Sequence, residues 1–237
     1  MTAPGIGPGS RGFQGSQGFQ GFQGFPDAAF AFYEGLVADN SKAYWTQHKP
    51  TYDAFVRQPM LDLLGDLEDE FGTGHAFRPH RDVRFSKEKT PYKDHQGGFV
   101  EVGDAVGLYV QISADGLLVA GGWYSPQGQQ IHRYRDVVDG PSGAELERIV
   151  AATRAAGIEV GGDRLATRPR GTSPDHPRLE LLRHRSVVAS RSWPPEPWMH
   201  TPEAEKVVRD TWREVSPLVE WLAASVGPGA DPGERRR

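Results

Sequence analysis

The sequence predicts an α+β fold, in which one antiparallel sheet in the middle of a single domain packs against N- and C-terminal helices. Apolar residues recur at helical spacing over residues 26–71 and 201–226, whereas residues 75–124 contain short segments rich in Val, Phe and Tyr. These helical and extended segments are grouped in blocks. A repeating βαβ pattern is therefore excluded.

The first block is helical. Pro26 and Asp27 favour a helix start, and a second helix is expected from Ser41. A third, amphipathic helix is expected to end at Gly72, and Pro59 suits its first turn. The residues expected to face the core from the first and third helices recur at three- and four-residue steps: Phe30, Tyr33, Val37, Met60, Leu63, Leu64, Leu67 and Phe71.

In the middle block, apolar residues no longer recur at helical spacing. Residues 75–124 are predicted to form three or four antiparallel strands. Ala114, Asp115 and Gly116 separate two of the apolar segments, which is typical of a hairpin turn.

Helices return after the sheet. Ser125 followed by Pro126 indicates an N-cap and a first-turn proline. Ser142 and Glu145 have the spacing of a capping box, which predicts the start of another helix.

The last third of the chain predicts a mixed end to the fold. Residues 158–170 and 186–192 are expected as short strands around a short helix at 177–184. The final helix is expected from Thr201, with a bend at Pro217. Its core stripe consists of Val208, Trp212, Val215, Val219 and Leu222.

Both ends of the chain are predicted to lie outside the domain, which is expected over residues 25–226. Residues 1–24 repeat Gly, Phe and Gln, and they offer too little apolar surface to offset the entropy of ordering. Residues 227–237 are expected to be a second disordered tail. The repeated Phe side chains could be contacts for a partner, although slipped duplication of one short coding unit is the favoured explanation.

Composition excludes several classes of protein. The chain has no cysteine, which excludes a disulfide scaffold and a thiol nucleophile and agrees with a reducing compartment. Its 27 basic and 31 acidic side chains give a net charge of −4, so nucleic-acid binding is disfavoured. No apolar run approaches the ~18 residues of a membrane span, and no signal-peptide pattern is present. We therefore expect a cytoplasmic protein; its oligomeric state is not predicted.

The densest group of charged residues lies at 78–95, where six Lys or Arg stand against three Asp or Glu. If residues 80–85 form a strand, His80, Asp82 and Arg84 share one face and the apolar residues between them face the core. Asp82 could then orient Arg84 toward a carboxylate or phosphate. The alternative is an ion-pair ladder without a ligand.

A resemblance adds to this interpretation. The string R-x-x-R-D-x-R-F-S-x-x-K-T-P-Y-K at residues 78–93 resembles the signature of a bacterial family known as domain of unknown function 2461. Further similarities follow in order along the chain: Gly24-Phe25-Pro26, Asn40, Trp45, Lys49, Tyr52, Gly107-Leu108-Tyr109, Gly121 to Tyr124, Arg170-Gly171 and Asp175-His176-Pro177. Glu88 departs from the Asp that is usual there, and the repeated GFQ units are an addition. The resemblance implies an intracellular α+β domain and no particular reaction.

Together these observations predict a pocket for an anionic small molecule. The expected ligand-binding residues are Arg78, Arg81, Asp82, Arg84, Lys89, Tyr92, Lys93 and Arg170. Any proton transfer would fall to His176 or Asp82, although Asp175 and His176 also suit a helix start. No cofactor is predicted. A metal site built from His80, Asp82, His95 and His176 is not supported by their spacing. The competing hypothesis is a non-catalytic interaction protein braced by an ion-pair network.

Overall fold

The computed structural model describes residues 21–81 and 90–228. Our expectations for residues 1–20 and 229–237, and for Asp82, Arg84 and Lys89, lie outside these ranges. Within them, the predicted α+β fold is confirmed. The mid-chain sheet has helices before and after it in the sequence.

The sheet is antiparallel throughout and has six strands in the order β1-β2-β3-β4-β6-β5. Ser113 pairs with Gly116 across the predicted hairpin between its two central strands. The strands are β1 (Gly74–Ala76), β2 (His95–Gly103), β3 (Val106–Ser113), β4 (Gly116–Trp123), β5 (Glu159–Gly161) and β6 (Val187–Trp193). The strand expected within residues 158–170 is thus confined to β5.

The N-terminal helices are α1 (Asp27–Ala38), α2 (Lys42–Tyr52), the π-helix η1 (Asp53–Arg57) and α3 (Gln58–Phe71). Ser41 caps α2 by accepting a hydrogen bond from the Tyr44 N–H, and Gly72 ends α3 at a φ of 91°. The prediction that Val37 faces the core is wrong, since its exposed fraction is 63%. The buried face of α1 includes Leu36, and the next residue points about 100° away from it.

The later helices are α4 (Gly128–Asp139), α5 (Gly143–Ala155), α6 (Leu179–Leu182), the 3-10 helix η2 (Pro197–His200) and α7 (Glu203–Val226). The predicted cap of α4 is wrong, since its N-cap is Gln127, not Ser125, and Gln127 forms a capping box with Gln130. Ser142 is the N-cap of α5, as predicted, but its side chain makes no capping bond.

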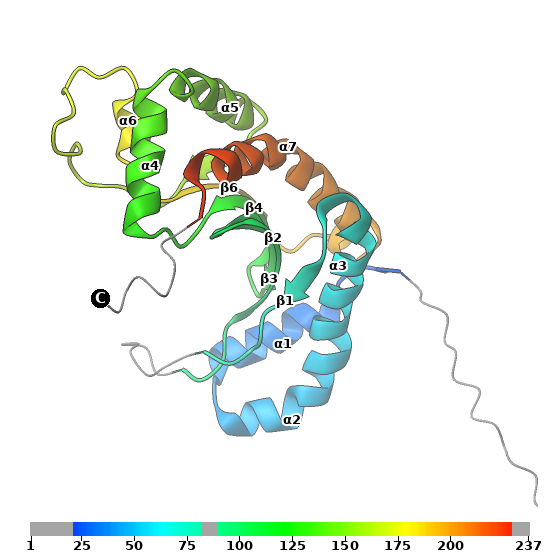
Figure 1. Ribbon diagram of the computed structural model, residues 1–237. Coiled ribbons are helices and arrows are strands. Elements are labelled where there is room, and N and C mark those ends of the chain that lie inside the picture. The colour runs from blue at the N-terminus through cyan, green and yellow to red at the C-terminus, as the bar shows by residue number, and fades with distance from the viewer. Residues whose placement is uncertain (1–20, 82–89, 229–237) are drawn as a thin grey trace, which may run out of the picture.

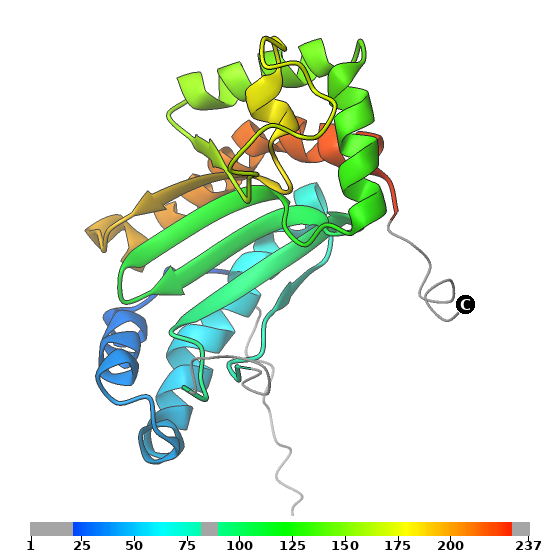
Figure 2. The same cartoon turned by 90° about the vertical axis from the view of Figure 1, so that its left-hand side faces the viewer.

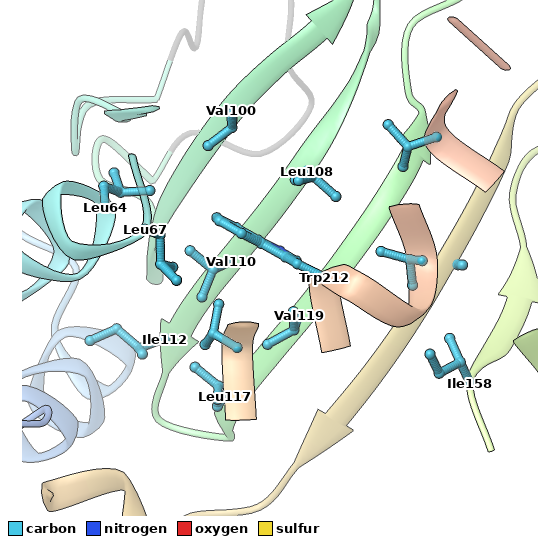
Figure 3. Close-up of a cluster of buried hydrophobic side chains, with 14 of the residues drawn as sticks. Leu64, Leu67, Val100, Leu108, Val110, Ile112, Leu117, Val119, Ile158 and Trp212 are labelled. Carbon is cyan, nitrogen blue, oxygen red and sulfur yellow. The ribbon is translucent and has the colours of Figure 1, made fainter. Parts of the chain in front are cut away.

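The core lies on the face of the sheet that α3 and α7 cover (Figure 1). Alternate residues of β3, among them Leu108 and Val110, point to this face and are buried (Figure 3). The predicted stripe of α7 is buried along its whole length, and the Trp212 indole N–H donates to the Tyr109 carbonyl across 3.1 Å. Gly121 lets α7 approach closely, because a Cβ there would lie 2.7 Å from Val215.

The opposite face of the sheet is turned toward the viewer in Figure 2, with α3 and α7 behind the strands. Helices α1 and α2 lie at one end of this open face, and α4 to α6 lie at the other (Figures 1 and 2). No helix in the described part of the chain is long and apolar enough to cross a membrane.

Candidate functional site

A short antiparallel ladder positions the described part of the charged segment. His80 pairs with Tyr92, the Arg81 N–H donates to the Pro91 carbonyl, and the Lys93 N–H donates to the Pro79 carbonyl. Of the strand predicted at 80–85, the structure describes only the start. The ladder brings Arg78 and Arg81 beside Lys93, just before β2.

Tyr92, which we predicted at the rim of a pocket, lines neither of the two hollows described below. Its side chain is buried and stacks on Trp45, with the ring centroids 4.3 Å apart. The Asn40 side chain bonds both the N–H and the carbonyl of Tyr92. Tyr92 therefore fixes the ladder to α2, which is a packing role.

Of the three other described cations of the ladder, one forms an ion pair with a described residue and two do not. Arg81 lies 3.5 Å from the Asp94 carboxylate. By contrast, Arg78 and Lys93 make no ion pair within residues 21–81 and 90–228. The Lys93 ammonium lies 4.9 Å from the centre of the Phe77 ring. Burial lowers the pKa of Lys93, and the charges of Arg78 and Arg81 lower it further.

Asp94 and His95 form a pair that we did not predict. The Asp94 carboxylate lies 2.8 Å from Nδ1 of His95. Burial raises the pKa of Asp94, but the hydrogen bond and charge of His95, together with Arg81, hold it below its ordinary value. Asp94 thus stays ionised and compensates part of the positive charge.

An apolar hollow of about 330 Å³ lies on the open face of the sheet beside this group. We define the aromatic hollow by its lining residues: Phe77, Phe99, Ala105, Tyr109, Tyr124 and Ser125. None of these residues was predicted to form a site, although the sequence contains one signal for the hollow. Phe99 and Tyr109 pair across β2 and β3 and alternate with core residues, so large rings occupy a face where polar residues were expected.

Two glycines make room for these rings. A Cβ at Gly97 would lie 2.6 Å from the Tyr109 hydroxyl, and a Cβ at Gly107 would lie 2.4 Å from the Phe99 ring. The rings therefore lie against the backbone of neighbouring strands. Such glycines within strands are typical of close approach between a side chain and the sheet.

Buried polar groups fix one wall of the hollow. The Gln96 side-chain amide donates to the carbonyls of Phe77 and Gly97, and its oxygen accepts a 2.6 Å hydrogen bond from Tyr52. Gln96 itself is 1% exposed. Phe77 is thus held by the backbone at the junction between hollow and cations.

The tyrosines of the hollow add no negative charge. Burial raises the pKa of Tyr109 to about 12 and that of Tyr124 further, so both stay protonated near neutral pH. The Tyr109 hydroxyl donates to the Gln111 side chain. The Tyr124 hydroxyl is buried without a hydrogen-bond partner among the described atoms. Of the aromatic pair at 123–124, Tyr124 lines the hollow, whereas Trp123 lies in the core.

Arg170 and His176 lie in a different place from the charged ladder. They line a second hollow of about 450 Å³ beside α4, together with His132, Arg135 and Asp139. Among the described residues of the charged segment, 78–81 and 90–93, none lines this second hollow. The single pocket that would join Arg170 and His176 to the described cations is therefore not formed.

Both ring nitrogens of His176 are engaged. Nε2 lies 2.8 Å from the Asp139 carboxylate, and Nδ1 accepts a hydrogen bond from the Arg178 N–H. Neither ring nitrogen is therefore open to a ligand. Asp175 does not cap a helix either, since α6 begins at Leu179. The contacts of His176 favour a structural role.

The residues considered for a metal site are also dispersed. His80 contacts the rings of Trp45 and Tyr92, His95 contacts Asp94, and His176 lies in the second hollow. Across the described ranges, no three His, Asp or Glu side chains are grouped as metal ligands.

Fold and site together define an α+β protein with an aromatic hollow on the open face of its sheet and Lys93 over one wall of that hollow. A family model matches residues 28–221, and the chain belongs to that family, described as conserved hypothetical protein (DUF2461). The matched range contains every residue of the aromatic hollow and of the ladder. No curated protein matches the sequence.

Proposed function

We propose that this protein is a cytoplasmic binding protein for a small molecule that carries a phosphate or carboxylate group next to an apolar ring. The ring would occupy the aromatic hollow, and the anionic group would contact Lys93 and Arg78. The observation that carries the proposal is that both cations are without an ion pair in the described structure, while Lys93 lies over Phe77, a wall of the hollow.

Electrostatics support an anion at this position. Two arginines crowd Lys93, and its partial burial already disfavours the ammonium form. A bound anion would relieve both effects, because it neutralises positive charge where water screens it least. Arg84 and Lys89, predicted to share this role, lie outside the described residues.

The volume and lining of the hollow favour a ligand with an apolar ring over a bare anion. Its volume of about 330 Å³ is near the lower end for small-molecule sites, and aromatic rings form most of its wall. Such walls favour stacking with a flat apolar group. Since Tyr109 and Tyr124 stay protonated, they do not repel an anion at the rim.

One observation favours the alternative of an internal brace. Arg81 is paired with Asp94, which in turn contacts His95. This pairing suits an ion-pair network that holds the ladder on the sheet. It does not extend to Arg78 or Lys93, so we assign Arg81 to positioning and the other two to binding. We propose no reaction.

The test is calorimetric titration of the full chain with phenyl phosphate, benzoate, inorganic phosphate and the neutral benzyl alcohol. We expect binding of the two aromatic anions only, weakened by about tenfold or more in Lys93→Met, because a charged hydrogen bond is lost. Lys42→Met is the matched control, since Lys42 is exposed and does not line the aromatic hollow. Equal binding by both variants, or no binding by the wild type, would refute the proposal.

A further inference from the structure

The N-terminal repeat enters the fold earlier than predicted. Phe22, which we had placed in the disordered tail, is 2% exposed, and Phe25 is fully buried. Their rings meet edge to face with centroids 5.0 Å apart. We call the recess that holds residues 21–25 the anchor slot. This segment precedes the range matched by the family.

The anchor slot holds the segment by its backbone as well as by its rings. The Phe22 N–H donates to the Asp66 carboxylate across 2.6 Å, and the Phe25 N–H donates to the Met199 carbonyl across 2.8 Å. Nδ1 of His200 lies 2.8 Å from the Phe25 carbonyl. The segment is thus bound between α3 and η2, as an extended peptide ligand would be.

The glycines are part of the fit. Gly24 has a φ of 110°, and a Cβ there would lie 2.3 Å from the backbone of His200. A Cβ at Gly21 would lie 2.7 Å from the Asp66 carboxylate. Gln23, between the two rings, is exposed. The anchor slot therefore requires glycine at position 24 and favours the pattern Gly-Phe-x-Gly-Phe, with an exposed side chain at the middle position.

The chain contains this string twice. Residues 21–25 read Gly-Phe-Gln-Gly-Phe, and residues 18–22 read the same. The next register upstream, residues 15–19, does not repeat it, because Ser16 stands at the position of the first Phe. A shift of three residues would place Phe19 and Phe22 where Phe22 and Phe25 now lie.

We propose that the anchor slot is a peptide-binding site for Gly-Phe-x-Gly-Phe and that residues 18–22 are a second ligand for it within the same chain. In the shifted register the same side chains fill the slot and the same backbone bonds form. Residues 23–25 then loop out before α1, so the cost is a short loop and one exposed Phe. Residues 18–22 can therefore replace residues 21–25 in the anchor slot.

A substitution that blocks only the first register tests this inference. Gly24→Ala clashes with the His200 backbone, so this variant should adopt the shifted register and stay folded. Phe19→Ser should leave the melting temperature of the wild-type chain unchanged. In the Gly24→Ala background it should lower the melting temperature by about 6–12 °C, because the replacement Phe is then lost from a buried position. Phe13→Ser in both backgrounds is the control.

A deletion series provides a second measurement. Removal of residues 21–23 restores Gly-Phe-Gln-Gly-Phe before Pro26, and it should leave the melting temperature unchanged. Removal of residues 18–23 leaves Gly-Ser-Gln-Gly-Phe and should lower it. Two outcomes would overturn the inference: Gly24→Ala unfolds the protein, or Phe19→Ser has the same effect in both backgrounds. A Gly24→Ala variant that folds only as a dimer would also overturn it, because residues 18–22 would then bind the slot of a second chain and not their own.

Discussion

At the scale of single residues, Lys93 combines a cost in the folded protein with a role in the proposed site. Its ammonium is partly buried beside two arginines, and its pKa is lowered. Residues whose presence destabilises the fold are often kept for function. We therefore expect a change at Lys93 to affect stability and binding in opposite directions.

Lys93→Met should raise the melting temperature at pH 7 while weakening binding of phenyl phosphate. Methionine removes the charge, and its thioether can still pack on the Phe77 ring, which offsets loss of the cation contact. Thermal denaturation of Lys93→Met and of the exposed control Lys42→Met measures the difference. A lower melting temperature for Lys93→Met alone would show that Lys93 is a structural brace.

The sign of the pH dependence follows from the lowered pKa. Between its folded pKa and its ordinary value of 10.5, Lys93 binds fewer protons in the folded state than in the unfolded state. Its cost to stability is therefore complete below the folded pKa and disappears as the pH rises toward 10.5. The advantage of Lys93→Met should shrink over the same range.

At this scale, charged residues are visible in the sequence, whereas the contacts that they and their neighbours make are not. A run of cations is visible at 78–93, but the sequence does not show that Tyr92 stacks on Trp45 or that Arg81 meets Asp94. Both contacts join segments distant in sequence or depend on how the ladder turns. Phe99 and Tyr109 looked like ordinary strand residues, because only the register of β2 and β3 pairs them.

At the scale of elements, two serines with similar sequence signals differ in their structural role. Ser41 has an extended backbone and accepts a hydrogen bond from the Tyr44 N–H. Ser142 has φ −68° and ψ −14°, which is helical, and its side chain makes no capping bond. A serine caps well only when its own backbone is outside the helix.

Ser41→Ala should therefore destabilise the protein by about 1 kcal/mol, whereas Ser142→Ala should leave its stability nearly unchanged. Urea denaturation of the two variants, followed by circular dichroism, provides the comparison. The motif at 142–145 alone predicts that Ser142→Ala is destabilising as well. Equal losses would mean that Ser142 forms its capping bond in solution.

The reason for this failure of the motif lies in the turn before α5. Gly143 is buried so closely against α4 that a Cβ there would lie 2.0 Å from the Val138 carbonyl. The chain must turn tightly between α4 and α5, and this turn draws Ser142 into helical geometry. The positions of helices were predictable from periodicity, whereas their caps depend on the angle at which each one meets its neighbour.

At the scale of the whole molecule, the block order of helices and strands was enough to predict the α+β class. Hydrophobic periodicity specifies which faces are buried, as in the stripe of α7. It does not specify which face of the sheet remains open. For that reason the sequence placed Arg170 and His176 with the charged segment, although the fold places them in the second hollow beside α4.

The two hollows allow a test of where an anion binds on the intact protein. If the proposal is right, phenyl phosphate should slow amide hydrogen exchange over residues 74–81 and 91–103, which carry Phe77, Lys93 and Phe99. Exchange over residues 169–176 should not change, because that loop shares no lining residue with the aromatic hollow. Ligand binding protects the elements it contacts as well as stabilising the fold. Protection that is centred on 169–176 instead would transfer the anion site to Arg170 and the hollow beside α4, and Lys93 would then have no part in it.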